Sequence, residues 1–248
     1  MNGLSIKIFA HRGASQLAPE NTMAAFQLAY ELGAEGIETD IHLTKDLIPV
    51  LIHDEHVKRT TDGIGAVKDY TFQQLHQLDA GSWFSEQFAR EQIIGLEEFL
   101  QWIKPLPLTL NLELKNGKEK DHQLEHIVYD LLTYYDLLHR TILSTFNIDS
   151  VMYMKNLTGI EVAFITSKRK RNLINFAKEH NIPALHIHYR LLKPRLMRQA
   201  RRANIPIRVY TVNKQAHMIN CFKLKCAAII TDMPNRAVNE RQRFFGCE

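Results

Sequence analysis

The sequence is short of cysteine and of long apolar runs. Its 248 residues include three cysteines, Cys221, Cys226 and Cys247, all late in the chain. The odd count and the absence of a CxxC pair argue against a disulfide framework and favour free thiols in a reducing compartment. No apolar stretch reaches the ~18 residues of a membrane span, and no basic-then-apolar leader precedes the first predicted strand. We therefore expect a cytoplasmic protein with no stable membrane insertion.

A large excess of charge of either sign is also missing. The chain carries 31 Lys and Arg against 27 Asp and Glu, a formal net charge of +4. This balance suits a small anionic substrate and is too weak to indicate nucleic acid. The 45% hydrophobic content is that of a globular protein able to bury a sizeable core. Composition leaves open whether the chain forms a homo-oligomer.

Two basic runs stand out against this balance. SKRKRN at 167–172 follows a predicted strand, and KPRLMRQARR at 193–202 has the pattern of a basic helix. The first run either attracts phosphate esters or an anionic membrane surface, or it is a solvated loop, and the solvated reading is favoured for both runs. Neither run interleaves aromatic residues, so neither indicates a nucleic-acid binder.

Short β-rich runs alternate with amphipathic helical patterns along the chain. Strands are expected at 6–10, 36–44, 108–115, 141–146, 160–166, 184–189, 207–212 and 227–231, with a further strand at 49–53 turned back beside the second. Eight strands that are each followed by a helix predict an α/β fold, a parallel sheet closed into a (β/α)8 TIM barrel. A doubly wound open sheet is the alternative, but the first strand lacks the glycine-rich turn of a dinucleotide site.

Residues 54–94 break this rhythm. They are rich in Thr, Asp, Gly and aromatic residues and show no strand–helix repeat. We interpret them as a small lobe inserted after the second strand, within a single domain that spans residues 1–248. Trp83, with Phe84, either forms a lip for the substrate there or packs the lobe on the barrel.

Charged residues gather at the predicted carboxyl ends of the strands, where such barrels place their active sites. Glu38 and Asp40 are two residues apart, so on a strand they share a face, and Glu113 on the next barrel strand can approach them. Buried charges are paired or bind metal, and an all-oxygen set suits Mg²⁺ or Ca²⁺ better than zinc. Structural salt bridges are the alternative for one or two of these acids.

Two histidines and two cations complete this group. His11 ends the first strand and His53 ends the strand turned back beside the second. A histidine pair can serve as base and acid in a displacement, while Arg12 could hold phosphate oxygens in a fork and Lys115 could add a point charge. The set predicts chemistry on a phosphoryl ester.

Taken in order, several segments resemble the glycerophosphodiester phosphodiesterase family. These are HRGASQLAPENT, GIETDIHLTKD, PVLIHDEHVKRTTDGIG, LDAGSWF, LNLELK, LSTFN, YTVN and IITDMPN, which run through nearly the whole chain. Each segment is weak alone, but the ordered combination is specific. Tyr210 in YTVN departs from the family, which often has Trp there, and we expect it to line the substrate wall.

The resemblance implies a barrel with a small insertion and a metal-dependent hydrolase of lipid and glycerol metabolism. It implies one divalent cation on Glu38, Asp40 and Glu113, and His11 and His53 as the acid/base pair. The products would be glycerol 3-phosphate and an alcohol. We favour His11 as the base and His53 as the acid, with water or the glycerol 2-hydroxyl as nucleophile.

Two other functions are carried as alternatives. The same scaffold could hydrolyse lysophospholipids or other phosphodiesters in the manner of a phospholipase D. It could also be a non-catalytic module that binds phosphate or lipid, although such a module is expected to have lost histidines or carboxylates that are present here.

Overall fold

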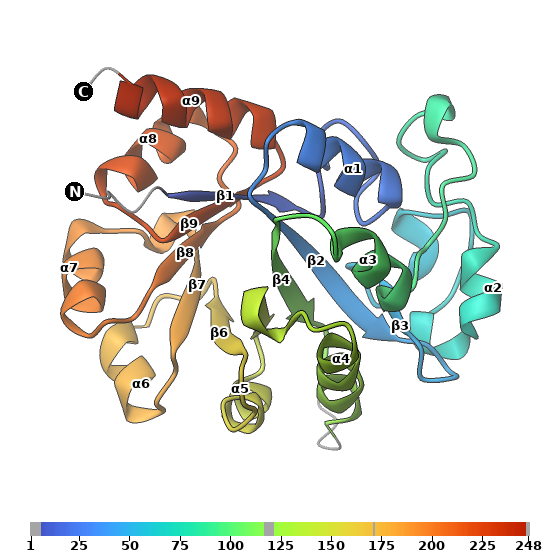
Figure 1. The fold of residues 1–248 in the computed structure, drawn as a ribbon, viewed down its shortest axis with the longest axis horizontal. Coiled ribbons are helices and arrows are strands. Elements are labelled where there is room, and N and C mark those ends of the chain that lie inside the picture. The colour runs from blue at the N-terminus through green and yellow to red at the C-terminus, as the bar shows by residue number, and fades with distance from the viewer. Residues whose placement is uncertain (1–5, 117–121, 171, 247–248) are drawn as a thin grey trace.

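The structure is a computed structural model that describes residues 6–116, 122–170 and 172–246. Its centre is a closed barrel of eight parallel strands, which confirms the predicted TIM barrel (Figure 1). Pairing runs in the order β1, β9, β8, β7, β6, β5, β4 and β2, and β2 pairs with β1 to close the ring. The strands are β1 (Lys7–His11), β2 (Gly36–Leu43), β4 (Thr109–Leu114), β5 (Thr141–Thr145), β6 (Glu161–Thr166), β7 (Ala184–His188), β8 (Ile207–Tyr210) and β9 (Ala228–Thr231).

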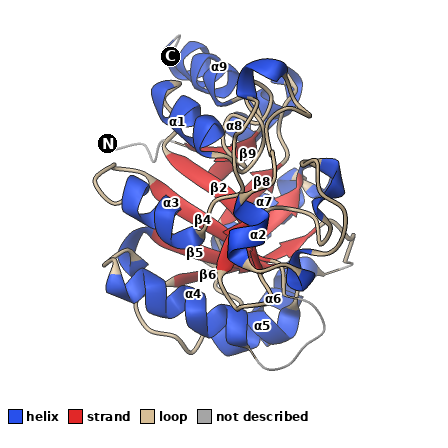
Figure 2. Cartoon of the chain, turned by 90° about the vertical axis from the view of Figure 1, so that its right-hand side faces the viewer, coloured by secondary structure: helices blue, strands red, loops and turns tan. Residues whose placement is uncertain are grey.

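Helices surround the strands on the outside of the barrel (Figure 2). They are α1 (Met23–Glu31), α3 (Leu96–Ile103), α4 (Gln123–Tyr134), α5 (Ile148–Met154), α6 (Leu173–Glu179), α7 (Pro194–Arg202), α8 (Gln215–Lys223) and α9 (Pro234–Gly246). None of the described helices is long and apolar enough to cross a membrane. Cys221 and Cys226 are buried free thiols, and Cys247 lies outside the described residues.

Strand alternation divides the core into two layers. Outward-facing strand residues pack against the helices, while inward-facing Phe9, Ile142, Ala163, Ala184 and Ala228 fill the barrel. The interior tolerates little extra volume, because a Cβ on Gly36 would lie 2.5 Å from the Phe9 ring.

The turn after β1 shows why the chain passes through a glycine before α1. Gly13 has a φ of +82°, and a Cβ there would lie 2.6 Å from the backbone of Ala25. Thr22 then caps the helix, its Oγ1 accepting a hydrogen bond from the Ala25 amide. This tight turn sets the end of β1 beside the start of α1 and so places His11 and Arg12.

The strand predicted at 49–53 is shorter than expected. β3 (Pro49–Leu51) pairs antiparallel with β2 and ends two residues early, so His53 lies in the turn that follows. Beyond it, residues 54–94 form short helices, including α2 (Phe72–His76), instead of a β/α unit. A small separate cluster holds them together and joins them to β3, made by Val50, Ile52, Val57, Val67, Leu75, Ala80 and Ile93. This segment lies beyond β3, at the right of Figure 1.

Candidate active site

Three carboxylates meet inside the carboxyl end of the barrel. Glu38 and Asp40 lie on β2 and Glu113 lies on β4, and strand register sets Asp40 directly beside Glu113. A carboxylate oxygen from each residue lies within 4.8 Å of the other two, and all three side chains are buried. The structure thus brings Glu113 to Glu38 and Asp40, the two acids that strand alternation places on one face.

The surroundings of Glu38 and Glu113 disfavour their ionised carboxylate forms. Burial, with the charge of Asp40 beside it, raises the pKa of Glu38 to about 8. Burial and Asp40 also raise the pKa of Glu113. Burial alone would raise the pKa of Asp40 too, but Lys115 and Arg12 hold it well below its usual range. Three buried oxygen donors that repel one another are the donor set a hard divalent cation requires, so these residues fit Mg²⁺ or Ca²⁺.

The two predicted phosphate-binding cations contact this same cluster. Arg12 Nε lies 3.1 Å from Asp40 Oδ2, and its Nη1 donates to Glu20 Oε1 at 2.8 Å. Lys115 Nζ lies 2.9 Å from Asp40 Oδ1 and donates a short hydrogen bond to Glu113. Both cations therefore lie at the acid cluster.

His11 is oriented by a carboxylate from the far end of the sequence. Its Nδ1 lies 2.5 Å from Asp232 Oδ1, and its Nε2 faces Glu38 Oε2 at 3.9 Å. Asp232 follows β9 and is held by Asn213 Nδ2 at 2.5 Å and Ser15 Oγ at 3.2 Å. Burial alone would lower the pKa of His11, but the charge of Glu38 and the bond to Asp232 raise it above its ordinary value.

His53 has a carboxylate of its own. Its Nδ1 lies 2.6 Å from Asp54 Oδ1, and Arg59 Nε donates to the other oxygen of Asp54 at 2.6 Å. That arginine lowers the pKa of Asp54 to about 2. Burial lowers the pKa of His53. Arg59 also binds Glu20 through two 2.8 Å hydrogen bonds.

These contacts join into one chain of alternating charge, which runs from His53 through Asp54, Arg59, Glu20 and Arg12 to Asp40. Sequence reasoning assigned no role to Glu20, Arg59 or Asp232. A signal for Asp232 was available, because it directly follows a predicted strand like the other site residues. Glu20 lies in a loop and Arg59 ends a short 3-10 helix, Val57–Arg59, so strand position gives no such signal for either residue.

The two predicted wall residues differ in position. Tyr210 ends β8, and burial together with the charge of Glu113 raises its pKa. Its ring makes an edge contact with Phe146, with centroids 6.3 Å apart. Trp83 Nε1 donates to the carbonyl oxygen of Ala80 at 2.8 Å and its ring packs on Phe84. Tyr210 therefore lies within reach of the charge of Glu113, whereas Trp83 makes its contacts inside the lobe.

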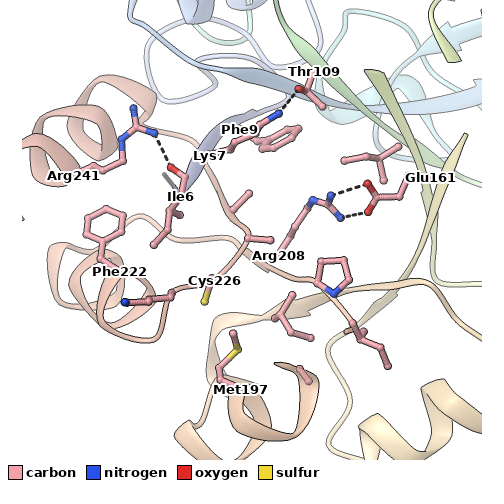
Figure 3. Close-up of a pocket in the computed structure, with 18 of the residues that line it drawn as sticks. Ile6, Lys7, Phe9, Thr109, Glu161, Met197, Arg208, Phe222, Cys226 and Arg241 are labelled. Carbon is pink, nitrogen blue, oxygen red and sulfur yellow. Dashed lines mark hydrogen bonds and ion pairs between the residues drawn. The ribbon is translucent and has the colours of Figure 1, made fainter. Parts of the chain in front are cut away.

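A large cavity lies at the opposite end of the barrel (Figure 3). It encloses about 1740 Å³ and is lined by residues from the amino ends of the strands. Arg208 there forms a paired contact with Glu161 at 2.7 and 3.0 Å, and Lys7 Nζ donates to Thr109 Oγ1 at 3.0 Å. Among the described residues, the acids that could hold a metal ion gather at the other end, at Glu38, Asp40 and Glu113. The group suited to proton transfer and metal binding is therefore the one at the carboxyl end.

Comparison with known proteins agrees with this geometry. The model of the glycerophosphoryl diester phosphodiesterase family matches residues 11–236. A glycerophosphodiester phosphodiesterase of Caldanaerobacter subterraneus is 35% identical, over 94% of this chain and 96% of its own. A glycerophosphodiester phosphodiesterase of Bacillus altitudinis is also 35% identical, over 95% of this chain and 98% of its own. An Oleispira antarctica phosphodiesterase, solved with the product sn-glycerol-3-phosphate, superposes with a TM-score of 0.88 at 28% identity, covering 94% of this chain and 96% of its own.

Proposed function

The chain belongs to the glycerophosphoryl diester phosphodiesterase family and is a glycerophosphodiester phosphodiesterase, and from that premise we propose how its residues share the work. Glu38, Asp40 and Glu113 hold one divalent cation, and His11 and His53 exchange protons with the substrate. The observation that carries this proposal is the convergence of three buried carboxylates with two histidines, each of which has its own carboxylate partner.

The repulsion among the three buried acids is the reason for proposing a cation site. Glu38 retains a proton near neutral pH when no cation faces it, since its pKa is about 8. When bound, Mg²⁺ or Ca²⁺ supplies positive charge against the phosphate oxygens and makes an oxygen nucleophile more acidic. Lys115 Nζ, which bridges Asp40 and Glu113, is then free to turn to a phosphate oxygen. Arg12 supports the same charge with its fork of donors.

The histidines move protons through Nε2. Asp232 and Asp54 each accept a hydrogen bond from the Nδ1–H of their histidine, which leaves Nε2 for the substrate. In the proposed order His11 takes the proton of the nucleophile, either water or the glycerol 2-hydroxyl. His53 gives its proton to the alcohol oxygen as the phosphorus–oxygen bond breaks. Such positioned groups contribute about 10²–10⁴-fold each.

Tyr210 and Trp83 are proposed as substrate contacts of different kinds. Tyr210 stands beside the acid cluster and would limit the space for glycerol or phosphate. Trp83 is 40% exposed and would meet only the alcohol portion of the substrate, if the lobe closes over it. Hydrolysis of lysophospholipids is not favoured, because the Caldanaerobacter and Bacillus relatives at 35% identity are named for glycerophosphodiesters.

The first test is release of glycerol 3-phosphate from glycerophosphocholine by the purified protein. We expect release with Mg²⁺ or Ca²⁺, and loss of release with a chelator. His11→Ala should lose most turnover, whereas His139→Ala, an exposed histidine on the far side, should not. Full activity in chelator, or equal turnover in the His11→Ala protein, would refute the proposal.

A second substrate can distinguish which histidine acts as the acid and which as the base. A nitrophenyl ester of glycerophosphate releases an alcohol that needs no proton in order to leave. If His53 is the acid, His53→Ala should recover activity on this ester far more than His11→Ala does. The opposite pattern would reverse the two roles, and no recovery in either variant would contradict a general acid altogether.

A further inference from the structure

Positive charge is concentrated in one part of this nearly neutral chain. Residues 162–231 contain fifteen Lys and Arg and a single acid, Glu179, so they carry a formal charge of +14. The rest of the chain carries −10. The positive part forms most of β6 and the elements from α6 through β9, which lie across the barrel from the inserted lobe (Figure 1).

Some of this charge lines a groove between the loop after β6 and the start of α7. The groove has a volume of about 630 Å³. The described lining residues include four cations and no acid, with leucines between them, namely Arg169, Lys170, Lys193, Arg195, Leu191 and Leu196. We call these six residues the cationic groove.

The groove opens at the catalytic end of the barrel. Both of its walls follow the carboxyl ends of strands, as the catalytic residues do. His188 at the end of β7 makes an edge contact with Tyr210, their ring centroids 5.8 Å apart. Phe146, 49% exposed, contacts the same tyrosine from the residue that follows β5. An exposed aromatic ring and the cationic groove therefore lie on the same end of the molecule.

The described part of the fold makes little use of the charges of the groove. Among the described residues, Arg169, Lys193 and Arg195 form no ion pair. Lys193 and Arg195 stand at the amino end of α7, whose first turn contains no acid, and cations there oppose the helix dipole. Lys170 alone has an internal partner, the ring of Phe176 at 3.3 Å. Three exposed cations without a structural use indicate an external partner of negative charge.

We propose that the cationic groove docks the catalytic end of the barrel onto an anionic phospholipid surface. A membrane offers many phosphates on a plane, which suits cations spread over two loops, and Phe146 can enter the interface beside them. No aromatic residue is among the described residues that line the groove, so it offers no surface for stacking bases, which disfavours nucleic acid. A glycerophosphodiester is a phospholipid that has lost its acyl chains, so the reaction that supplies this substrate is ester hydrolysis at such a surface. Docking does not depend on the proposed roles of the catalytic residues.

The test is sedimentation of the whole protein with vesicles. One set contains phosphatidylcholine alone and the other contains added phosphatidylglycerol. The variant Arg169→Gln/Lys193→Gln/Arg195→Gln removes the three unpaired charges of the groove. The matched control Lys178→Gln/Lys223→Gln/Lys225→Gln removes three exposed charges at the opposite end of the barrel. Each basic residue at an anionic surface contributes about fivefold in partition.

We expect binding to the anionic vesicles at about 0.1 M salt, weak binding to phosphatidylcholine, and release as salt rises. The groove variant should lose on the order of 100-fold in partition, with its melting temperature and its turnover of soluble glycerophosphocholine unchanged. The control variant should lose far less. Absence of binding to anionic vesicles, equal losses in the two variants, or tighter binding to single-stranded DNA than to vesicles would each overturn the proposal.

Discussion

Without a divalent cation, Glu38 should make the protein less stable as the pH rises. Burial and the charge of Asp40 raise the pKa of Glu38 to about 8 in the folded protein. In the unfolded chain a glutamate titrates near ~4.3. Between these two values the folded state holds a proton that the unfolded state has lost, so the contribution of Glu38 to stability falls as the pH rises.

The size of the effect follows from the two pKa values. A difference of one pKa unit corresponds to about 1.4 kcal/mol. Between about pH 5 and pH 8 the contribution of Glu38 should therefore fall by on the order of 3 kcal/mol. A cation bound to the cluster replaces the proton, so its presence should remove most of this slope and raise stability most at high pH.

Other groups titrate in the same range with the opposite sign. His186 is buried, and burial lowers its pKa well below the ordinary value, so its contribution to stability is lost as the pH falls. The measurement is therefore a difference between the native protein and Glu38→Gln, each unfolded in urea with chelator across this pH range. Their stabilities should diverge as the pH rises, in favour of the variant. Parallel curves would refute the argument, and so would a divergence that persists with excess Mg²⁺ or Ca²⁺.

Two other substitutions test the structure more locally. Arg12→Lys should lower kcat/KM on glycerophosphocholine by more than about tenfold, because an ammonium cannot replace two fixed donors to Asp40 and phosphate; steady-state kinetics that match the native protein would contradict this role. Gly36→Ala should cost about 1–3 kcal/mol in urea unfolding, because its Cβ would lie 2.5 Å from the Phe9 ring; an unchanged denaturation midpoint would show that the interior can yield.

The sequence pattern predicts most of this arrangement where it depends on local rules. Alternation places Glu38 and Asp40 on one face, and the order of strands places Glu113 beside them. The start of α1 could be predicted to within one residue, because Asn21 or Thr22 can cap the helix and the structure uses Thr22. The length of β3 could not be read in this way, because the apolar run continues to Ile52 while strand pairing stops at Leu51.

Contacts between residues far apart in the sequence could not be predicted from local sequence patterns. Asp232 reaches His11 only because β9 pairs with β1 and closes the barrel. The sequence marks Asp232 as a strand-end residue without indicating which side chain it meets. Glu20 joins Arg12 to Arg59 across two loops, and the contact depends on where the inserted lobe folds back.

The two histidines differ in the carboxylates that support them, and this difference predicts unequal losses. Apart from His11, the side chains that donate hydrogen bonds to Asp232 are the neutral Asn213 and Ser15. The full charge of Asp232 therefore acts on His11. The charge of Asp54 is shared with Arg59, which lowers its pKa to about 2. Asp232→Asn should therefore reduce kcat by on the order of 10²-fold or more, with KM nearly unchanged, and Asp54→Asn should reduce it only by about tenfold. Equal losses in the two variants would mean that these carboxylates only fix the rings in place and that their charge has no part in the reaction.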